Sequence, residues 1–319
     1  MKVLIIGAGV IGSFNAARLF RGGVDVKLLA RGERLAALRE HGVVLQDWRT
    51  GIRSITSVPL VERIGPSDQY DLAVVIVRHN HVASVLPLLA AASHLPSVLF
   101  LGNNLAGSSD MAEALGGERV LTGMVNAGGF RDGVVVRYIF NRRLRLLFGE
   151  ADGAIRARTR AIGEMFRGAG LPARAVTDPE AYQKTHAAGL PAFAGALYSA
   201  GGSVRLLARR PDLLHLFVAG YRDALRALRC DGTAIRPGMT RALLWAPEWP
   251  LRAGLRYFFD TELAVVGGQA HALAAVDEMR ELAEELHVIL QRTGVRSPAN
   301  ERAYAAITAW AEGADASRG

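Results

Sequence analysis

Six consecutive residues near the N-terminus, Gly7-Ala8-Gly9-Val10-Ile11-Gly12, have the G-x-G-x-x-G spacing of loops that hold a dinucleotide. The apolar segment 2–6 precedes them, and residues 11–21 have the pattern of a helix. In this context Gly7 permits a tight turn, Gly9 lets the backbone approach a pyrophosphate, and Gly12 lets the helix pack on the strand. The helix N-terminus adds free N–H groups and the positive end of its dipole. We therefore expect these six residues to bind a dinucleotide cofactor.

Two arginines at strand ends bear on which dinucleotide is bound. NAD sites usually place Asp or Glu after the second strand, where it accepts hydrogen bonds from the ribose 2′-hydroxyl. Here the predicted strand 24–30 is followed by Arg31, whose guanidinium can pair with a 2′-phosphate. Arg78 follows the next buried strand, 71–77, at the same edge of the predicted sheet. Either arginine alone could be a solvated loop charge, but together they favour NADP over NAD.

The elements that must hold these residues alternate between strand and helix in the first half of the chain. Apolar runs separated by helical stretches indicate parallel β-α-β units. The later part of this half predicts a β-pair, a helix and a last short strand. The predicted strands are 2–6, 24–30, 71–77, 97–101, the pair 134–138 and 143–148, and 173–176; the later helix is 154–167.

The pattern changes at Thr177. Asp178-Pro179-Glu180 is typical of a helix start, and little strand pattern follows it. Helices are predicted over 213–229, 275–292 and 300–311. We therefore predict an α/β Rossmann-type domain over residues 1–176, followed by an all-α domain over 177–319.

Composition excludes several classes of protein. The 319 residues contain one cysteine, Cys230, which excludes an intramolecular disulfide framework, a Cys₄ zinc site and a thiol redox pair, and we expect no metal. The net charge is +8, but the basic residues are scattered and not interleaved with aromatics, which argues against nucleic acid as a partner. No stretch offers the roughly 20 apolar residues of a membrane span. We expect a cytoplasmic protein without a membrane partner.

Taken in order, the motifs resemble those of the ketopantoate reductase (2-dehydropantoate 2-reductase) family. The similarity runs the length of the chain, and its order and spacing are more specific than any single segment after the glycine motif. Its segments are Gly7–Gly12, Leu29–Arg31, Val75–Arg78, Leu99–Asn104, the loop Phe130–Gly133 before the predicted β-pair, Tyr182–Lys184, Val276–Glu278 and Gly294–Asn300.

The resemblance implies a 6-phosphogluconate-dehydrogenase-like fold and an NADPH-dependent reduction of a ketone of the 2-oxo acid type. Lys184 would be the general acid, a role that partial burial favours by lowering a lysine pKa toward the working pH. Glu278 would orient the substrate, and Asn103 would lie beside the nicotinamide. His186 is an alternative acid, but residues two apart on a helix do not share a face, so we expect it to be a bystander. The partner would be a small carbonyl compound, and a homodimer is compatible with the family.

Four positions depart from the family pattern. Ala188, Ala192, Gly202 and Val266 stand where the family has polar side chains that hold the substrate. The substrate pocket at these positions is therefore either changed or decayed. Polar groups of ketopantoate buried there would lose their water without gaining a hydrogen-bond partner from the protein. We expect a substrate larger or more apolar than ketopantoate. An NADP-dependent dehydrogenase or imine reductase of the same fold, and a non-catalytic NADP-binding protein, stay open as alternatives.

Overall fold

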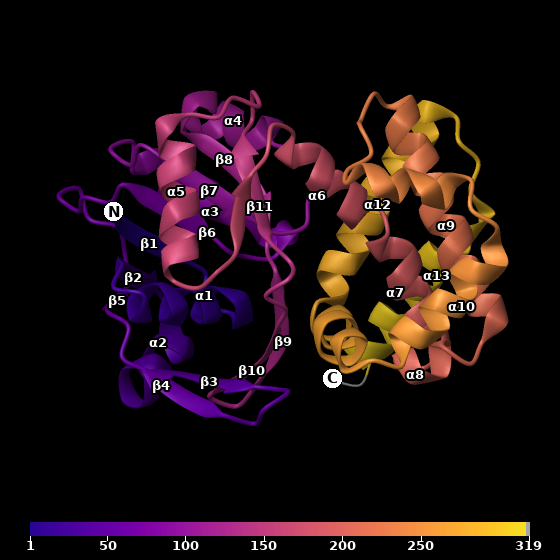
Figure 1. The fold of residues 1–319 in the computed structure, drawn as a ribbon, viewed down its shortest axis with the longest axis horizontal. Coiled ribbons are helices and arrows are strands. Elements are labelled where there is room, and N and C mark those ends of the chain that lie inside the picture. The colour runs from indigo at the N-terminus through magenta and orange to yellow at the C-terminus, as the bar shows by residue number, and fades with distance from the viewer. Residues whose placement is uncertain (317–319) are drawn as a thin grey trace. The chain divides into compact units, whose positions relative to one another are not determined.

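The computed structural model describes residues 1–316, which form two compact units (Figure 1). The first unit contains Met1–Gly102 and Gly107–Glu180, and the second contains Asn103–Ala106 and the chain from Ala181 onward. The short segment Asn103–Ala106 belongs with the second unit because Leu105, 1% exposed, lies in that unit's apolar core. Sequence periodicity cannot detect such an excursion of four residues.

The first unit is built on an eight-stranded sheet with the order β12-β11-β8-β7-β6-β1-β2-β5. All neighbouring strands in it run parallel except β8 and β11, which are antiparallel. This confirms the predicted Rossmann-type α/β arrangement. Its strands are β1 (Lys2–Ile6), β2 (Asp25–Leu29), β5 (Leu60–Val61), β6 (Leu72–Val75), β7 (Val98–Leu101), β8 (Val120–Met124), β11 (Leu146–Glu150) and β12 (Ala173–Ala175).

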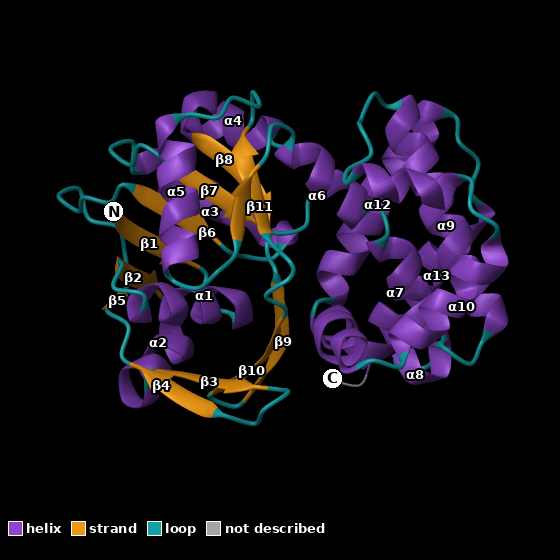
Figure 2. Cartoon of the chain, viewed as in Figure 1, coloured by secondary structure: helices purple, strands orange, loops and turns teal. Residues whose placement is uncertain are grey.

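Helices flank this sheet (Figure 2). Alternate residues of β1 enter two different apolar clusters, because successive side chains of a strand point to opposite faces. Val3 and Ile5 join the cluster that contains Phe14 of α1, whereas Leu4 and Ile6 join the one that contains Leu89 of α3. The helices of this unit are α1 (Val10–Arg21), α2 (Gly32–His41), α3 (Val82–Ala91), α4 (Ser109–Leu115), α5 (Ala157–Gly168) and the 3₁₀ helices His79–His81 and Gly117–Arg119.

A second sheet corrects one prediction. The strands β3 (Val43–Asp47), β4 (Arg53–Thr56), β9 (Ala127–Asp132) and β10 (Val135–Phe140) form a separate sheet in the order β4-β3-β10-β9. The predicted pairing of 134–138 with 143–148 is wrong: β10 pairs with β9 and β3, while β11 pairs with β8 and β12. The segment Phe130–Asp132 accordingly lies in β9 and not in a loop. The actual hairpin turns at Gly133, whose φ of +57° glycine adopts without strain.

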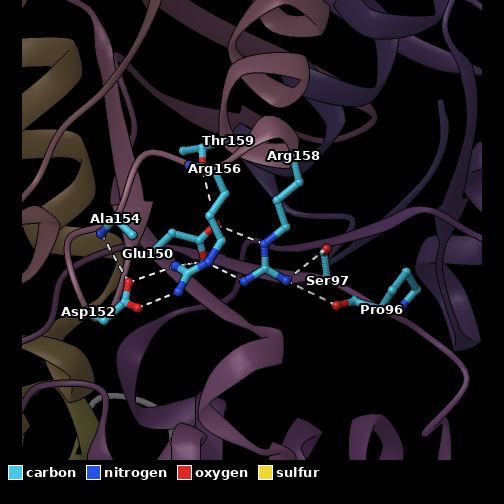
Figure 3. A network of polar contacts seen from close by, with 8 residues as sticks. All are labelled: Pro96, Ser97, Glu150, Asp152, Ala154, Arg156, Arg158 and Thr159. Carbon is cyan, nitrogen blue, oxygen red and sulfur yellow. Dashed lines mark hydrogen bonds and ion pairs between the residues drawn. The ribbon is translucent and has the colours of Figure 1, made fainter.

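A buried carboxylate on β11 links the large sheet to helix α5 (Figure 3). Glu150, 2% exposed, ends β11 and accepts hydrogen bonds from both Arg158, at 2.8 Å from Nε to Oε1, and the Thr159 hydroxyl, at 3.0 Å. Arg158 also donates to the Pro96 carbonyl and lies 3.4 Å from Ser97 Oγ, just before β7. The network therefore links α5 to two strands.

Arg158→Ala should lower the free energy of unfolding by about 2 kcal/mol, because it leaves the buried Glu150 carboxylate without its closest charge partner. Urea denaturation followed by circular dichroism measures this. Arg39→Ala is the control: the Arg39–Glu62 pair is more than half exposed on both sides, and exposed pairs contribute about 0–1 kcal/mol. Equal effects of the two variants would contradict the structural role of Arg158.

Only helices follow β12 among the described residues, which confirms the predicted helical second half. The alanine and glycine content allows close approach of helix axes: a Cβ on Gly195 of α7 would lie 2.4 Å from the Cα of Ala303 in α13. Within residues 1–316, no helix is long and apolar enough to cross a membrane. The helices are α6 (Pro179–Ala187), α7 (Leu190–Ser199), α8 (Val204–Leu207), α9 (Pro211–Cys230), the 3₁₀ helix Gly238–Leu244, α10 (Glu248–Phe259), the π-helix Ala264–Gln269, α11 (Ala270–Ala274), α12 (Val276–Thr293) and α13 (Pro298–Ala316).

Candidate functional site

The glycine motif forms the turn between β1 and α1, and each glycine has a separate physical reason. Gly7 has φ +112°, and a Cβ there would lie 2.2 Å from the carbonyl oxygen of Ile76. A Cβ on Gly12 would lie 1.7 Å from the carbonyl oxygen of Gly7. A Cβ on Gly9 would meet nothing within 4 Å. The loop is therefore closed on the protein side and open above Gly9, where a pyrophosphate has room at the helix N-terminus.

The predicted arginines lie at the same sheet edge as the glycine loop. β1 pairs in parallel with both β2 and β6, so the segments that follow these three strands emerge together. Arg31 caps the start of α2, is exposed, and donates from Nε to the carbonyl oxygen of Glu62 at 3.3 Å. Arg78 follows the end of β6 at Val75 by three residues and precedes the 3₁₀ helix His79–His81. Both guanidinium groups thus belong to loops at the edge that carries the dinucleotide turn.

A third arginine, which the sequence did not single out, contacts the glycine loop directly. Arg34 of α2 donates from Nε to the carbonyl oxygen of Ala8 at 2.9 Å and from Nη2 to Ser13 Oγ at 3.1 Å. Burial lowers the pKa of Arg34, and the positive charge of Arg131 lowers it further. Arg34 fixes the shape of the loop and adds positive charge beside it. One helical turn separates it from Arg31, which is the signal that could have found it.

In the second unit, the structure brings together two predicted residues that are far apart in the sequence. Asn103 donates from Nδ2 to Oε1 of Glu278 at 3.2 Å. A third side chain joins them: Nε2 of His271 lies 3.4 Å from Asn103 Nδ2 and 3.2 Å from Glu278 Oε2. The Glu278 side chain is 3% exposed and that of His271 is 39% exposed. We call these three residues the polar cluster.

Local structure explains the placement of the polar cluster. Asn103 follows β7 and is anchored by the buried neighbour Leu105. Glu278 lies in the first turn of α12, where the helix dipole favours a carboxylate. His271 lies on the short helix α11, which follows the π-helix Ala264–Gln269 and ends where Ala275 leaves helical geometry, with φ −133° and ψ +46°. Such π-helical irregularities are frequent at functional sites.

Lys184 lies in the second turn of α6 and is half-buried. Its neighbours Gln183 and Thr185 are both 2% exposed and belong to the packed side of the helix. Thr185 is held on that side, because its Oγ1 accepts from the Arg236 amide at 3.0 Å and its carbonyl accepts from the Tyr221 hydroxyl at 3.0 Å. These contacts fix the rotation of α6 and therefore the direction in which Lys184 leaves it.

His186 is an exposed residue of α6, although many protein atoms lie near its ring. Desolvation lowers the pKa of His186, and the nearby charge of His271 lowers it further. The ring is therefore mainly neutral at pH 7, since an unperturbed histidine already has a pKa of about 6.5. A neutral imidazole is a poor general acid at that pH.

The four positions that depart from the family pattern are filled by packing. Ala188, Ala192 and Val266 are 0% exposed. Ala192 packs against α9, where a Cβ on Gly220 would lie 2.8 Å from the Cβ of Ala192. Gly202 has φ +78°, and a Cβ there would lie 3.0 Å from the ring of Trp310. These four positions are thus buried, and their residues supply no side-chain hydrogen bond.

A Rossmann-type unit with this glycine loop, followed by a helical unit, is an arrangement typical of dinucleotide-binding oxidoreductases. Residues 3–153 match the family model of the ketopantoate reductase PanE/ApbA family. This match over residues 3–153 confirms the family resemblance that the motifs predicted.

Individual proteins are similar to this chain in sequence or in fold. The chain is 27% identical over 170 residues to the uncharacterized oxidoreductase YkpB of Bacillus subtilis (strain 168), and the alignment spans 53% of this chain but only 55% of that relative. The fold is similar to 2-dehydropantoate 2-reductase from Geobacter metallireducens GS-15, with TM-score 0.77 and 18% identity over 97% of this chain and 99% of the other. It is also similar to D-mandelate dehydrogenase in a ternary structure with NADH and anilino(oxo)acetate, with TM-score 0.79 and 15% identity over 98% and 99%. These structures show that the similarity in fold extends over both units, since the two alignments cover 97% and 98% of this chain.

Proposed function

We propose that this protein is an NADPH-dependent reductase of 2-oxo acids in which Lys184 is the general acid. The observation that carries the proposal is the contact of Asn103 with Glu278, two residues 175 positions apart, in a chain that also has a dinucleotide loop. A buried carboxylate and an amide brought together in this way offer an acceptor and a donor to a small polar substrate.

The roles of the residues follow from their chemistry. Bound NADPH would supply a hydride equivalent to the carbonyl carbon of the substrate. Lys184 protonates the carbonyl oxygen, and its positive charge stabilises the alkoxide character that develops there. Asn103 donates a hydrogen bond from its amide, and Glu278 accepts one from a polar hydrogen of the substrate. Gly7–Gly12 and Arg34 shape the loop that receives the pyrophosphate.

The preference for NADPH over NADH is inferred from the residues that follow the strands at one edge of the large sheet. The residues directly after β2 are Ala30 and Arg31, so the position that holds Asp or Glu in NAD sites carries no carboxylate to repel a 2′-phosphate. Arg31 and Arg78 offer guanidinium groups that can pair with it.

Arg31→Ala should weaken NADPH binding about tenfold and leave NADH binding within about twofold, because it removes a charge-assisted contact that only the 2′-phosphate can make. Fluorescence titration with both cofactors measures this. Arg39→Ala is the matched control, since Arg39 also contacts Glu62 but lies two turns farther along α2. If both cofactors lose affinity equally, Arg31 does not read the 2′-phosphate.

We propose that the substrate is larger or more apolar than ketopantoate. The four enclosed positions leave the hydroxyl group of ketopantoate without side-chain partners, and an unpaired buried hydroxyl costs binding energy. The similarity in fold to D-mandelate dehydrogenase suggests a 2-oxo acid with an aromatic side chain as a test compound.

NADPH oxidation tests the proposal with ketopantoate, phenylglyoxylate, aliphatic 2-oxo acids and a cyclic imine as substrates. We expect the highest kcat/KM for phenylglyoxylate or another apolar 2-oxo acid. Turnover of ketopantoate at ordinary enzyme rates would overturn the substrate assignment. Turnover of the imine alone would indicate an imine reductase, and NADPH binding without any turnover would indicate a non-catalytic protein.

A further inference from the structure

His271 makes two contacts in the polar cluster through a single atom. Its Nε2 lies 3.2 Å from Oε2 of Glu278 and 3.4 Å from Nδ2 of Asn103, while Asn103 Nδ2 also donates to the other oxygen of Glu278. Each member of the cluster thus touches the other two. Neither the motifs nor the family resemblance assigns any role to His271.

The protonation state of Nε2 of His271 decides which contact this nitrogen can make. A ring nitrogen that carries a proton donates, and one that lacks it accepts. With a proton on each ring nitrogen, the charged ring forms an ion pair with Oε2 of Glu278 at 3.2 Å, while Oε1 accepts the hydrogen bond from Asn103. Without its proton, Nε2 accepts the second hydrogen of the Asn103 amide, so both amide hydrogens are held. In either state His271 removes rotational freedom from one of the two predicted site residues.

We propose that His271 is a positioning residue that holds the Glu278 carboxylate and the Asn103 amide in the orientation that binds the carbonyl substrate. This inference rests on the proposed function. The geometry fits the role because Glu278 and His271 lie on separate helices, α12 and α11, and the non-helical Ala275 lies between these helices. The imidazole thus adds a side-chain link between the two helices across this junction.

Because the Glu278 carboxylate is buried, losing its contact with His271 should weaken substrate binding. Glu278 is almost enclosed, so a partner lost from its carboxylate is not fully replaced by water. Nearby His186 cannot replace the imidazole as a donor to an anion while it is mainly neutral, as its lowered pKa indicates. A glutamine side chain could replace it in part, because its amide also has both a donor nitrogen and an acceptor oxygen.

The test compares His271→Ala with His271→Gln, using the best substrate of the panel. The alanine variant should raise KM for the carbonyl substrate about tenfold, with a smaller change in kcat and an unchanged Kd for NADPH, as expected for one lost hydrogen bond to a charged group. The glutamine variant should recover KM to within about threefold of the unchanged protein. His287→Ala is the control, because that histidine is exposed on α12 and contacts Gln291 instead. An alanine variant within twofold of the unchanged protein, or a glutamine variant no better than alanine, would overturn the inference.

A second measurement separates this inference from the proposed function. In asparagine-¹⁵N-labelled protein, the side-chain amide signal of Asn103 is identified by its loss in Asn103→Ala. That signal should shift in His271→Ala and stay in place in His287→Ala, whether or not any 2-oxo acid is turned over. An unshifted signal would show that His271 does not hold the amide, whereas a shifted signal with no turnover would overturn only the proposed reaction.

Discussion

Lys184→Ala should lower kcat by about 10²- to 10⁴-fold, the range over which a positioned general acid contributes. The loss has two sources, because the variant removes both the proton donor and the positive charge beside the developing alkoxide. The Kd for NADPH should stay within about twofold, since the glycine loop and its arginines belong to the first unit. Steady-state kinetics together with a fluorescence titration of the cofactor measure both quantities.

Lys184→Arg separates the two sources of this loss. The chain has only three lysines, Lys2, Lys27 and Lys184, among 38 basic residues, so arginine is its ordinary cation. Arginine keeps the charge but has a pKa too high to release a proton near neutrality. We expect the arginine variant to stay at least about tenfold below the unchanged protein. Lys27→Ala, in the first unit, is the control for a lysine with no part in the reaction. Full activity in Lys184→Ala would show that another group supplies the proton.

The large sheet was predictable where its strands are buried on both faces. Every residue of β6 and β7 is buried, and a continuous apolar run is the sequence signal of such a strand. The small sheet lacked that signal. β4 has two exposed residues of its four, and β9 contains two adjacent glycines. Gly129 is required because a Cβ would lie 2.2 Å from the carbonyl oxygen of Arg137 on the paired strand, which is a tertiary reason that periodicity does not report.

The residues of the candidate site also differ in whether the sequence could predict them. The glycine loop could be predicted because its chemistry is local: six consecutive residues between one strand and one helix. Asn103 and Glu278 came from the family resemblance, and their contact exists only after the segment 103–106 joins the second unit. Arg34 and His271 belong to no recognisable motif. Arg34 acts through Ala8 and Ser13, which precede it by 26 and 21 residues, and His271 contacts Asn103, which precedes it by 168. Their roles in binding and catalysis, like those of the other site residues, are predictions that the experiments above test.

Gly9→Val should raise the Kd for NADPH at least about 100-fold and leave the melting temperature of the cofactor-free protein within about 2 °C. Gly9 has φ −75°, which any residue adopts, and its Cβ would meet no protein atom within 4 Å. The added side chain therefore strains nothing in the protein and occupies the space that the pyrophosphate needs. Isothermal titration with NADPH and a thermal melt measure the two effects.

Gly12→Ala should behave in the opposite way and lower stability by about 3 kcal/mol, because its Cβ would lie 1.7 Å from the carbonyl oxygen of Gly7 and force α1 away from β1. Saturating NADPH should raise the melting temperature of the unchanged protein, since a ligand that binds only the folded state stabilises it, but should not raise that of Gly9→Val. Tight NADPH binding by Gly9→Val would mean that the pyrophosphate lies elsewhere. The pair of variants thus separates the glycine that the ligand requires from the glycine that the fold requires, although the motif places them only three residues apart.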